Sequence, residues 1–210
     1  MIRIMIDFET VANGLKPAIF ELGYVAFDED YKEIDYGIIG IDLLSSLFAG
    51  LDISQGTIDW WRSQSAEAKK SAIESQVDAL TIKQALEGFM SILDTLRADD
   101  AAMTGEAGVL ELIGNGMISD NVWLMSACEA VGINLQEHLL HTEHFCYRQE
   151  MKRALRQYGW NPHWEIPFKG TKHNSVDDCR HQIRCLEALE KLDDSDPELI
   201  PEAISLILGE

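Results

Sequence analysis

Two acidic residues stand two positions apart at the end of an apolar segment near the start of the chain. Residues 2–6 are apolar enough to form a buried strand, and Asp7 and Glu9 follow. Because side chains alternate across a strand, we expect both carboxylates on one face. Like charges held side by side are costly unless a cation lies between them, and hard divalent cations prefer oxygen ligands. Alone the pair is a weak signal, because an acidic strand end exposed to water has the same spacing.

Three further residues could belong to the same site although they lie far away in the sequence. Asp120 stands at the expected start of a helix that follows a strand, and Asp178 lies in the first turn of another helix. His173 precedes that helix in a loop, and an imidazole pKa near ~6.5 suits proton removal from water. Each residue also has an ordinary explanation. An acid in a first helical turn interacts favourably with the helix dipole, and a loop histidine can simply be exposed.

The elements that would position these residues follow from apolar periodicity and turn residues. Strands are expected at 2–6, 19–27, 33–41, 109–113 and 143–146. Helices are expected at 65–73, 81–96, 119–131, 149–158, 175–192 and 197–208, with a loop at 161–172. This order predicts an α/β protein with a mixed sheet flanked by helices. Residues 1–194 are expected to form the domain, and 195–210 a C-terminal helix packed on it or at a dimer interface.

Composition indicates a globular protein without a membrane span. Apolar residues make up 46% of the 210 residues, and the sequence contains no apolar run of membrane-spanning length. The first residues lack the pattern of a signal peptide, so a cytoplasmic location is expected. The cysteines show no Cys-x-x-Cys spacing, which favours reduced thiols over a structural zinc site: Cys128, Cys146, Cys179, Cys185.

The net charge of −19 restricts how the chain could bind nucleic acid. Broad phosphate binding depends on lysine and arginine, so a long basic groove is not expected. A site that grips only a few terminal nucleotides needs few such contacts, and bound cations would add positive charge among the carboxylates. We therefore expect a short footprint.

Taken together, the acidic segments and the histidine resemble the motifs of the DEDDh exonucleases of the RNase H-like superfamily. The first motif is Ile-Asp-Phe-Glu-Thr at 6–10, and the second is Asn-Gly-Met-Ile-Ser-Asp at 115–120. The third is His-Asn-Ser-Val-Asp-Asp at 173–178, with Ser175 where the family pattern has alanine. Thr-Ile-Asp-Trp-Trp at 57–61 is similar to an element of the RNase T-like exoribonucleases and the related phage exonucleases. The residues after Thr10 depart from the Thr-Thr-Gly run of the wider family.

This resemblance implies an RNase H-like five-stranded sheet and a metal-dependent 3′→5′ exonuclease that releases nucleoside 5′-monophosphates. Two divalent cations, Mg²⁺ or Mn²⁺, would be held by Asp7, Glu9, Asp120 and Asp178, and His173 would deprotonate the attacking water. Asp178 is preferred to the neighbouring Asp177, because the family places its ligand five residues after the histidine.

Substrate contacts are expected from three residues beside the motifs. Thr10 follows the first motif, Trp61 and its neighbour Trp60 could stack on a base, and Lys172 could hold a phosphate. Core packing explains at least one of the tryptophans equally well, and an exposed loop lysine is usually only solvated. The motifs do not distinguish RNA from DNA, or single from double strands.

Two other functions are compatible with the sequence. The acidic charge would suit a module that has kept the nuclease fold but lost catalysis and now binds or regulates. It would also suit an acidic interaction protein whose last helix binds a partner or a second copy of the chain. Buried carboxylates without cations are expensive, which favours the nuclease.

Overall fold

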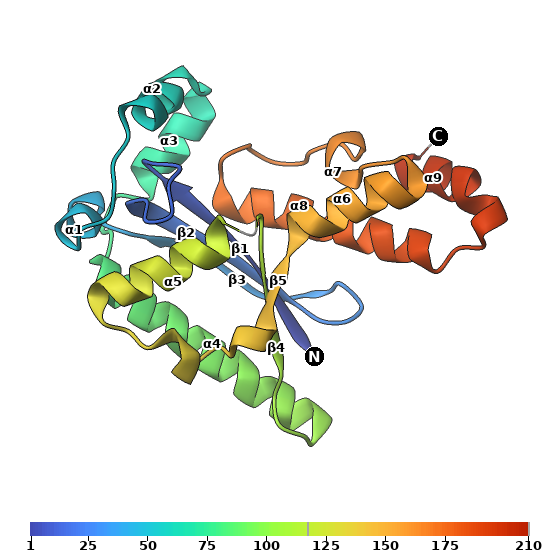
Figure 1. The fold of residues 1–210 in the computed structure, drawn as a ribbon, viewed down its shortest axis with the longest axis horizontal. Helices are drawn as coiled ribbons and strands as arrows, with labels where there is room; N and C mark the ends of the chain where they lie inside the picture. The colour runs from blue at the N-terminus through green and yellow to red at the C-terminus, as the bar shows by residue number, and fades with distance from the viewer. Residues whose placement is uncertain (117, 210) are drawn as a thin grey trace.

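The computed structural model describes residues 1–116 and 118–209, and its centre is a mixed five-stranded sheet (Figure 1). The strand order is β3-β2-β1-β4-β5. The first three strands pair antiparallel, whereas β4 and β5 run parallel to β1. Their bounds are β1 Ile2–Thr10, β2 Ile19–Phe27, β3 Glu33–Gly40, β4 Leu110–Gly114 and β5 His144–Cys146. The expected α/β class with a mixed, helix-flanked sheet is confirmed. Met117 of the second motif and Glu210 of the C-terminal segment lie outside the described residues.

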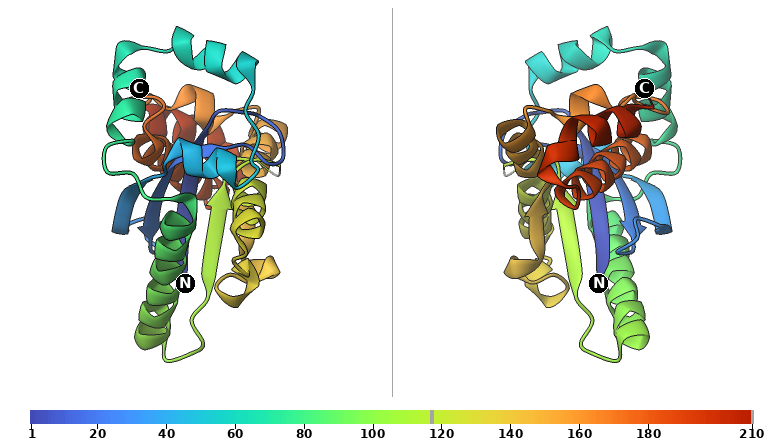
Figure 2. Two further views of the ribbon diagram at one scale, coloured as in Figure 1. Left: turned by 90° about the vertical axis from the view of Figure 1, so that its left-hand side faces the viewer. Right: turned by 90° about the vertical axis from the view of Figure 1, so that its right-hand side faces the viewer.

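Helices cover both faces of this sheet (Figures 1 and 2). Helices α4 and α5 close one hydrophobic core, and α6 and α8 close the other. Shorter helices α1, α2 and α3 follow β3, and α9 packs on α8 near the C-terminus. The helical bounds are α1 Leu43–Phe48, α2 Gln55–Ser63, α3 Ala66–Glu74, α4 Ile82–Thr104, α5 Asp120–Val131, α6 Tyr147–Tyr158, α7 Pro162–Glu165, α8 Ser175–Asp193 and α9 Ile200–Leu208. Short 3₁₀ turns lie at Leu135–Glu137, His141–Glu143 and Pro197–Leu199.

The two faces of β1 serve different cores. Ile4, Ile6 and Phe8 belong to the core under α4 and α5, whereas Met5 belongs to the core under α8. Because side chains alternate along a strand, Asp7 and Glu9 share the face of Met5. The acidic pair therefore points toward α8.

The expectation that β1 ends at Asp7 is wrong, since the strand continues to Thr10. Pairing with β2 runs along its whole length, to Thr10 opposite Ile19. Pairing with β4 stops earlier, at Ile6 opposite Gly114. Backbone pairing with β2 thus keeps the acidic segment extended, while its other edge is free to meet a different partner.

Three helices were not predicted from the sequence, and there is a physical reason for each omission. Helices α1 and α2 are short, and Ser54 at the start of α2 makes no side-chain capping hydrogen bond, so their local signals are weak. Helix α7 lies inside the segment expected to be a loop, where Asn161 caps a helix with Pro162 at its first position. Helix α4 also runs eight residues beyond its expected end at residue 96, because its second half packs on the sheet through Arg97 and Asp100.

The C-terminal helix α9 packs against α8 and against Trp160, which follows α6. Partly buried residues of α9 contact Trp160, Ala188 and Leu192: Ile200, Ala203, Ile204, Ile207 and Leu208. Its other expected role, at a dimer interface, stays a prediction, as does the division of the chain at residue 194. Among the described residues, no helix is long and apolar enough to cross a membrane.

One ion pair joins α4 to the segments where β4 and β5 begin. Arg97 Nη1 and Nη2 lie 2.6 and 2.7 Å from the two carboxylate oxygens of Glu143, which is buried. The same carboxylate accepts hydrogen bonds from the backbone N–H groups of Leu110 and Leu140. Removing the arginine would leave a buried, unpaired charge.

We therefore expect Arg97→Ala to lower the free energy of unfolding by about 3 kcal/mol, because breaking a buried pair leaves the remaining charge uncompensated. The matched control is Arg62→Ala, which removes an exposed pair with Asp59 and should cost less than about 1 kcal/mol. Urea denaturation of both variants measures the difference. Equal losses would contradict the structural role given to Arg97.

Candidate active site

Asp120 occupies the gap that opens where β4 stops pairing with β1. Its Oδ1 accepts a hydrogen bond from the Phe8 N–H at 3.1 Å, and its Oδ2 accepts one from the Asn115 N–H at 2.7 Å. The carboxylate thus replaces β4 as the partner of the free β1 edge. This places Asp120 beside the strand that carries Asp7 and Glu9.

The turn before α8 brings His173 and Asp178 to the same place. Asn174 caps α8 by accepting a hydrogen bond from the Asp177 N–H at 3.1 Å. The His173 N–H donates to Asp178 Oδ2 at 2.7 Å, and the His173 backbone adopts a positive φ of 64°. Such a conformation is costly for a residue with a Cβ, and strain of this kind is often found at functional sites. The possible ligand atoms of Glu9, His173 and Asp178 lie within 4.8 Å of one another.

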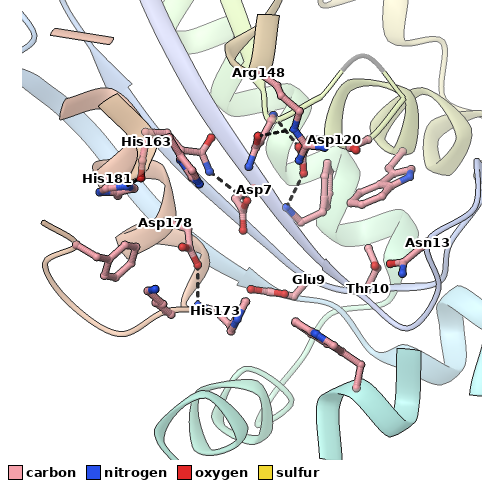
Figure 3. A pocket seen from close by; sticks show the side chains of 18 of the residues that line it. Asp7, Glu9, Thr10, Asn13, Asp120, Arg148, His163, His173, Asp178 and His181 are labelled. Carbon is pink, nitrogen blue, oxygen red and sulfur yellow. Dashed lines mark hydrogen bonds between the residues drawn. The ribbon is translucent and has the colours of Figure 1, made fainter. Parts of the chain in front are cut away.

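These residues line one pocket of about 850 Å³. Figure 3 shows Asp7 at its centre, with Glu9, Asp120, Asp178 and His173 around it. The five residues expected to carry the chemistry are therefore brought together from β1, the start of α5 and the start of α8.

Burial raises the pKa of every one of these carboxyls. The pKa of Asp7 is raised well above its ordinary value by burial first and then by the charges of Asp120, Glu9 and Asp178. The pKa of Glu9 is raised in the same way, by burial and then by Asp178. Burial also raises the pKa of Asp178 to about 7, and that of Asp120 against the opposing hydrogen bonds from backbone N–H groups. Arg148 and Lys172 oppose this rise at Asp120 and Asp178, but the pKa of each carboxyl remains raised, so the protein compensates the negative charge of the site only in part.

A divalent cation fits this donor set. No lysine or arginine of the described chain forms a salt bridge with Asp7, Glu9 or Asp178. The partner found for Asp7 is a neutral amide, since Gln182 Nε2 lies 3.4 Å from Asp7 Oδ1. Carboxylate oxygens are the ligands that Mg²⁺, Mn²⁺ and Ca²⁺ prefer.

Asp177, the alternative to Asp178, is used elsewhere. Its Oδ2 accepts a hydrogen bond from the Thr171 N–H at 2.8 Å, and its carboxylate fills the space beside Gly170. Asp178 lines the pocket, whereas Asp177 holds the preceding loop. This arrangement agrees with the five-residue offset from His173.

The tryptophan pair forms one wall of the pocket. Trp61 Nε1 donates to the Thr10 carbonyl at 2.9 Å, and its ring packs edge-on against Phe20. The Trp60 ring is 43% exposed and lies 4.9 Å from the ring of His173. All three expected contacts, Thr10, Trp61 and Lys172, line the pocket, and Trp60 offers the more accessible aromatic face of the two tryptophans.

The residues of the other wall of the pocket were not predicted from the sequence. This wall includes Trp164 of α7, which is 77% exposed, and Phe168, whose ring lies 5.8 Å from the ammonium group of Lys172. Arg148 also lines the pocket and lies 3.4 Å from Asn115 Oδ1. One signal was available: Arg148 follows β5 directly, and carboxyl ends of parallel strands meet at the edge where ligands bind. Nothing local to Trp164 distinguished it from an ordinary surface residue.

A buried polar cluster under α7 holds this second wall in place. The Tyr147 hydroxyl lies 2.9 Å from His163 Nδ1, His181 Nε2 lies 3.2 Å from the His163 carbonyl, and Cys185 Sγ lies 3.7 Å from His181 Nε2. His163, His181 and Cys185 each offer an atom of a kind that binds metal ions, and these atoms lie within 4.8 Å of one another. However, burial raises the pKa of the Cys185 thiol to about 11, and hydrogen bonds account for the arrangement. We therefore interpret the cluster as the anchor of α7.

Comparison with known families identifies the group to which this geometry belongs. A family model described as the Rv2179c-like 3′–5′ exoribonuclease domain matches residues 2–190. The chain belongs to this family. An exodeoxyribonuclease of Enterobacteria phage T4 is 39% identical over 90 residues, which make up 39% of this chain and 39% of the phage protein. The match to that relative therefore spans about two fifths of its length.

Solved structures of nucleases share the fold. The nuclease domain of 3′hExo, a DEDDh family member bound to rAMP, is 14% identical with a TM-score of 0.61, and 92% of each chain is covered. An exonuclease I–ssDNA complex from E. coli with zinc bound is 9% identical with a TM-score of 0.62, covering 98% of this chain and 42% of that one. The expected resemblance to RNase H-like DEDDh nucleases is confirmed at the level of fold.

The raised carboxyl pKa values predict how the metal-free protein responds to pH. The folded chain keeps protons that the unfolded chain releases between about pH 4 and pH 7, so stability falls as pH rises through this window. We expect the Tm in EDTA to be lower at pH 8 than at pH 5, and Mn²⁺ to raise the Tm more at pH 8. Scanning fluorimetry measures both effects.

The control for this prediction is Asp7→Asn, which removes one of the repelling charges. At pH 8 the metal-free variant should melt above the native chain and show a smaller Mn²⁺ shift. A native metal-free Tm that does not fall between pH 5 and pH 8, or a variant that melts below it at pH 8, would contradict the electrostatic account.

Proposed function

We propose that this protein is a metal-dependent 3′→5′ exonuclease that releases nucleoside 5′-monophosphates from nucleic-acid ends. The observation that carries the proposal is the convergence of Asp7, Glu9, Asp120, Asp178 and His173 on one pocket. Membership of a family described as 3′–5′ exoribonuclease domains supports it.

The four carboxylates are assigned as the ligands of two divalent cations, Mg²⁺ or Mn²⁺. Once bound, such cations would polarise the scissile phosphate and neutralise charge on the attacking and leaving oxygens. Asp7 lies among the other three acids, so it is the best placed to be shared between two ions.

His173 is assigned as the general base that accepts a proton from the attacking water. Burial and the neighbouring Lys172 lower the pKa of His173, so its imidazole is neutral and able to take a proton at neutral pH. Its backbone N–H is fixed on Asp178, and its ring lies against Trp60. The residue is thus oriented by the same acid that would bind the metal.

The walls of the pocket suit the last nucleotides of a single strand. Trp60 and Trp61 stand on one side, and Trp164 and Phe168 on the other. Base stacking on aromatic rings contributes about 1–3 kcal/mol per base and tolerates any sequence. Arg148 and Lys172 add two cations at the pocket, which matches a short footprint in an acidic protein. Thr10 is assigned to the terminal nucleotide beside Glu9.

For this proposed function, the first prediction concerns the reaction itself. With Mg²⁺ or Mn²⁺, 5′-labelled single-stranded RNA and DNA should be shortened stepwise, and the unlabelled product should be a nucleoside 5′-monophosphate. Asp7→Asn should lower kcat at least about a hundredfold through loss of metal binding, and His173→Gln about 10²–10⁴-fold through loss of the base. Gel electrophoresis and chromatography of the products measure these effects.

Asp177→Asn is the matched control for these variants, because it changes an acid beside Asp178 that does not line the pocket and keeps an oxygen that can accept the Thr171 N–H hydrogen bond. It should keep activity within a few-fold of the native chain. If neither RNA nor DNA is shortened with either cation, the proposed function is wrong. Running RNA and DNA of one sequence side by side also shows which the active site prefers.

The second prediction separates binding of the strand from chemistry at the phosphate. Trp164→Ala should lower kcat/KM on a single-stranded ten-nucleotide substrate about tenfold, because one stacking surface is lost. On the p-nitrophenyl ester of thymidine 5′-monophosphate, which has one base, the same variant should stay within about twofold of the native chain. Phe48→Ala, at an 88% exposed aromatic outside the pocket, should change neither. Equal losses on both substrates would contradict a role in strand binding.

A further inference from the structure

The serine that replaces alanine in the third motif contacts a buried glutamate outside every motif. Ser175 Oγ lies 2.5 Å from Glu21 Oε1, and the Ser175 N–H donates to the same oxygen at 3.4 Å. Glu21 is 1% exposed and Ser175 is fully buried. A hydrogen bond to a buried charged group is among the strongest that a side chain makes, and removing one partner is correspondingly expensive.

Glu21 joins the two elements that carry the candidate ligands. It stands on β2 directly opposite Glu9 on β1, and Ser175 is the first residue of α8, which carries Asp178. Direct packing supports the same junction, since a Cβ added at Gly23 would lie 2.3 Å from Ser175 Oγ. The start of α8 therefore rests on the backbone of β2, and the Glu21–Ser175 contact fixes its position along that strand.

A third element is tied to the same junction. Asn174, which caps α8, donates from Nδ2 to Ser71 Oγ of α3 at 3.1 Å. The hydroxyl of Ser75, at the end of α3, also interacts with the Glu21 carboxylate. Helix α3, which follows the tryptophan pair, is thus bound to Asn174 and Glu21, and these residues also hold the turn of His173.

Glu21 itself is not placed to bind the metals. It does not line the pocket, and one of its oxygens is already occupied by two hydrogen bonds from Ser175. The Glu21 charge also raises the pKa of Glu9 and Asp178, but its hydrogen bonds act on the site through the position of α8.

We propose that Glu21 and Ser175 form a positioning pair that sets how far Asp178 and His173 stand from Glu9, and thereby sets the affinity of the site for divalent cations. This inference rests on the proposed function. Residues behind the direct ligands of a metal commonly change affinity 10–100-fold when they are substituted, because they orient the ligands.

The test measures Mn²⁺ binding to the full chain by electron paramagnetic resonance of the free ion, alongside kcat and KM. Glu21→Leu should weaken Mn²⁺ binding at least about tenfold and lower kcat, with KM for a single-stranded oligonucleotide within about threefold. Ser175→Ala should act in the same direction. The Glu21→Leu, Ser175→Ala double variant should be no worse than Glu21→Leu alone, because coupled residues are not additive.

Two further variants separate positioning from simple stability. Ser46→Ala is the matched control, since Ser46 is also fully buried and donates its hydroxyl to the Ile19 carbonyl of β2. It should lower the Tm without changing Mn²⁺ affinity. Glu21→Gln keeps the acceptor oxygen and should recover most of the Mn²⁺ affinity lost in Glu21→Leu.

Three results would overturn the inference. They are unchanged Mn²⁺ affinity in Glu21→Leu, additive losses in the double variant, or a Glu21→Gln variant as impaired as Glu21→Leu. Mn²⁺ binding is read without any turnover. A wild-type chain that binds Mn²⁺ but shortens no nucleic acid would therefore reject the proposed function separately from the positioning pair.

Discussion

Repulsion among buried carboxylates is the constraint on which the rest of the structure depends. Asp7, Glu9, Asp120 and Asp178 share one pocket, and burial raises the pKa of each of them. A chain that only had to be stable would replace such groups with apolar or neutral side chains, since uncompensated buried charge is costly. The fold instead positions each acid through backbone groups. Asp120 accepts hydrogen bonds from two backbone N–H groups, and Asp178 accepts one from the His173 N–H. Asp7 and Glu9 lie on a strand that is paired with β2. Because backbone fixes them, the acids cannot move apart to relieve the repulsion, and a cation becomes the favourable way to do so.

The acidic surface and the aromatic walls of the pocket fit the same mode of nucleic-acid binding. A net charge of −19 repels polyanions, so affinity gained from many phosphate contacts is not accessible to this chain. Stacking does not depend on charge, and aromatic rings outnumber lysine and arginine side chains in the pocket lining, where Trp60, Trp61, Trp164 and Phe168 lie beside Arg148 and Lys172. Under the proposed function, such a site binds the end of a strand through its bases and leaves the rest of the polymer in solvent. That balance favours short contacts and rapid release, which suit removal of one nucleotide at a time.

The sequence predicted the parts of this structure that depend on local pattern. Period-two alternation placed Asp7 and Glu9 on one face, and the strands and most of the long helices were found within a few residues of their bounds, with α4 eight residues longer than expected. It could not show that β1 continues through its acidic segment, because pairing with β2 rather than strand propensity keeps Glu9 and Thr10 extended. Trp164 was missed for a similar reason. It lines the pocket because of where α7 lies relative to β1, and a single sequence does not encode that distance in any local pattern.

The spacing of the third motif has a physical origin in this fold. His173 and Asp178 are five residues apart because the histidine N–H closes a hydrogen-bonded turn onto the carboxylate of the first helical turn. The turn includes the positive φ of His173, which costs about 1–3 kcal/mol and persists only where neighbouring contacts fix it. The Asn174 cap supplies one such contact, and the Asp177 carboxylate, bound to the Thr171 N–H, supplies another. The turn therefore couples the proposed base to the proposed ligand, because the element that positions Asp178 also positions His173.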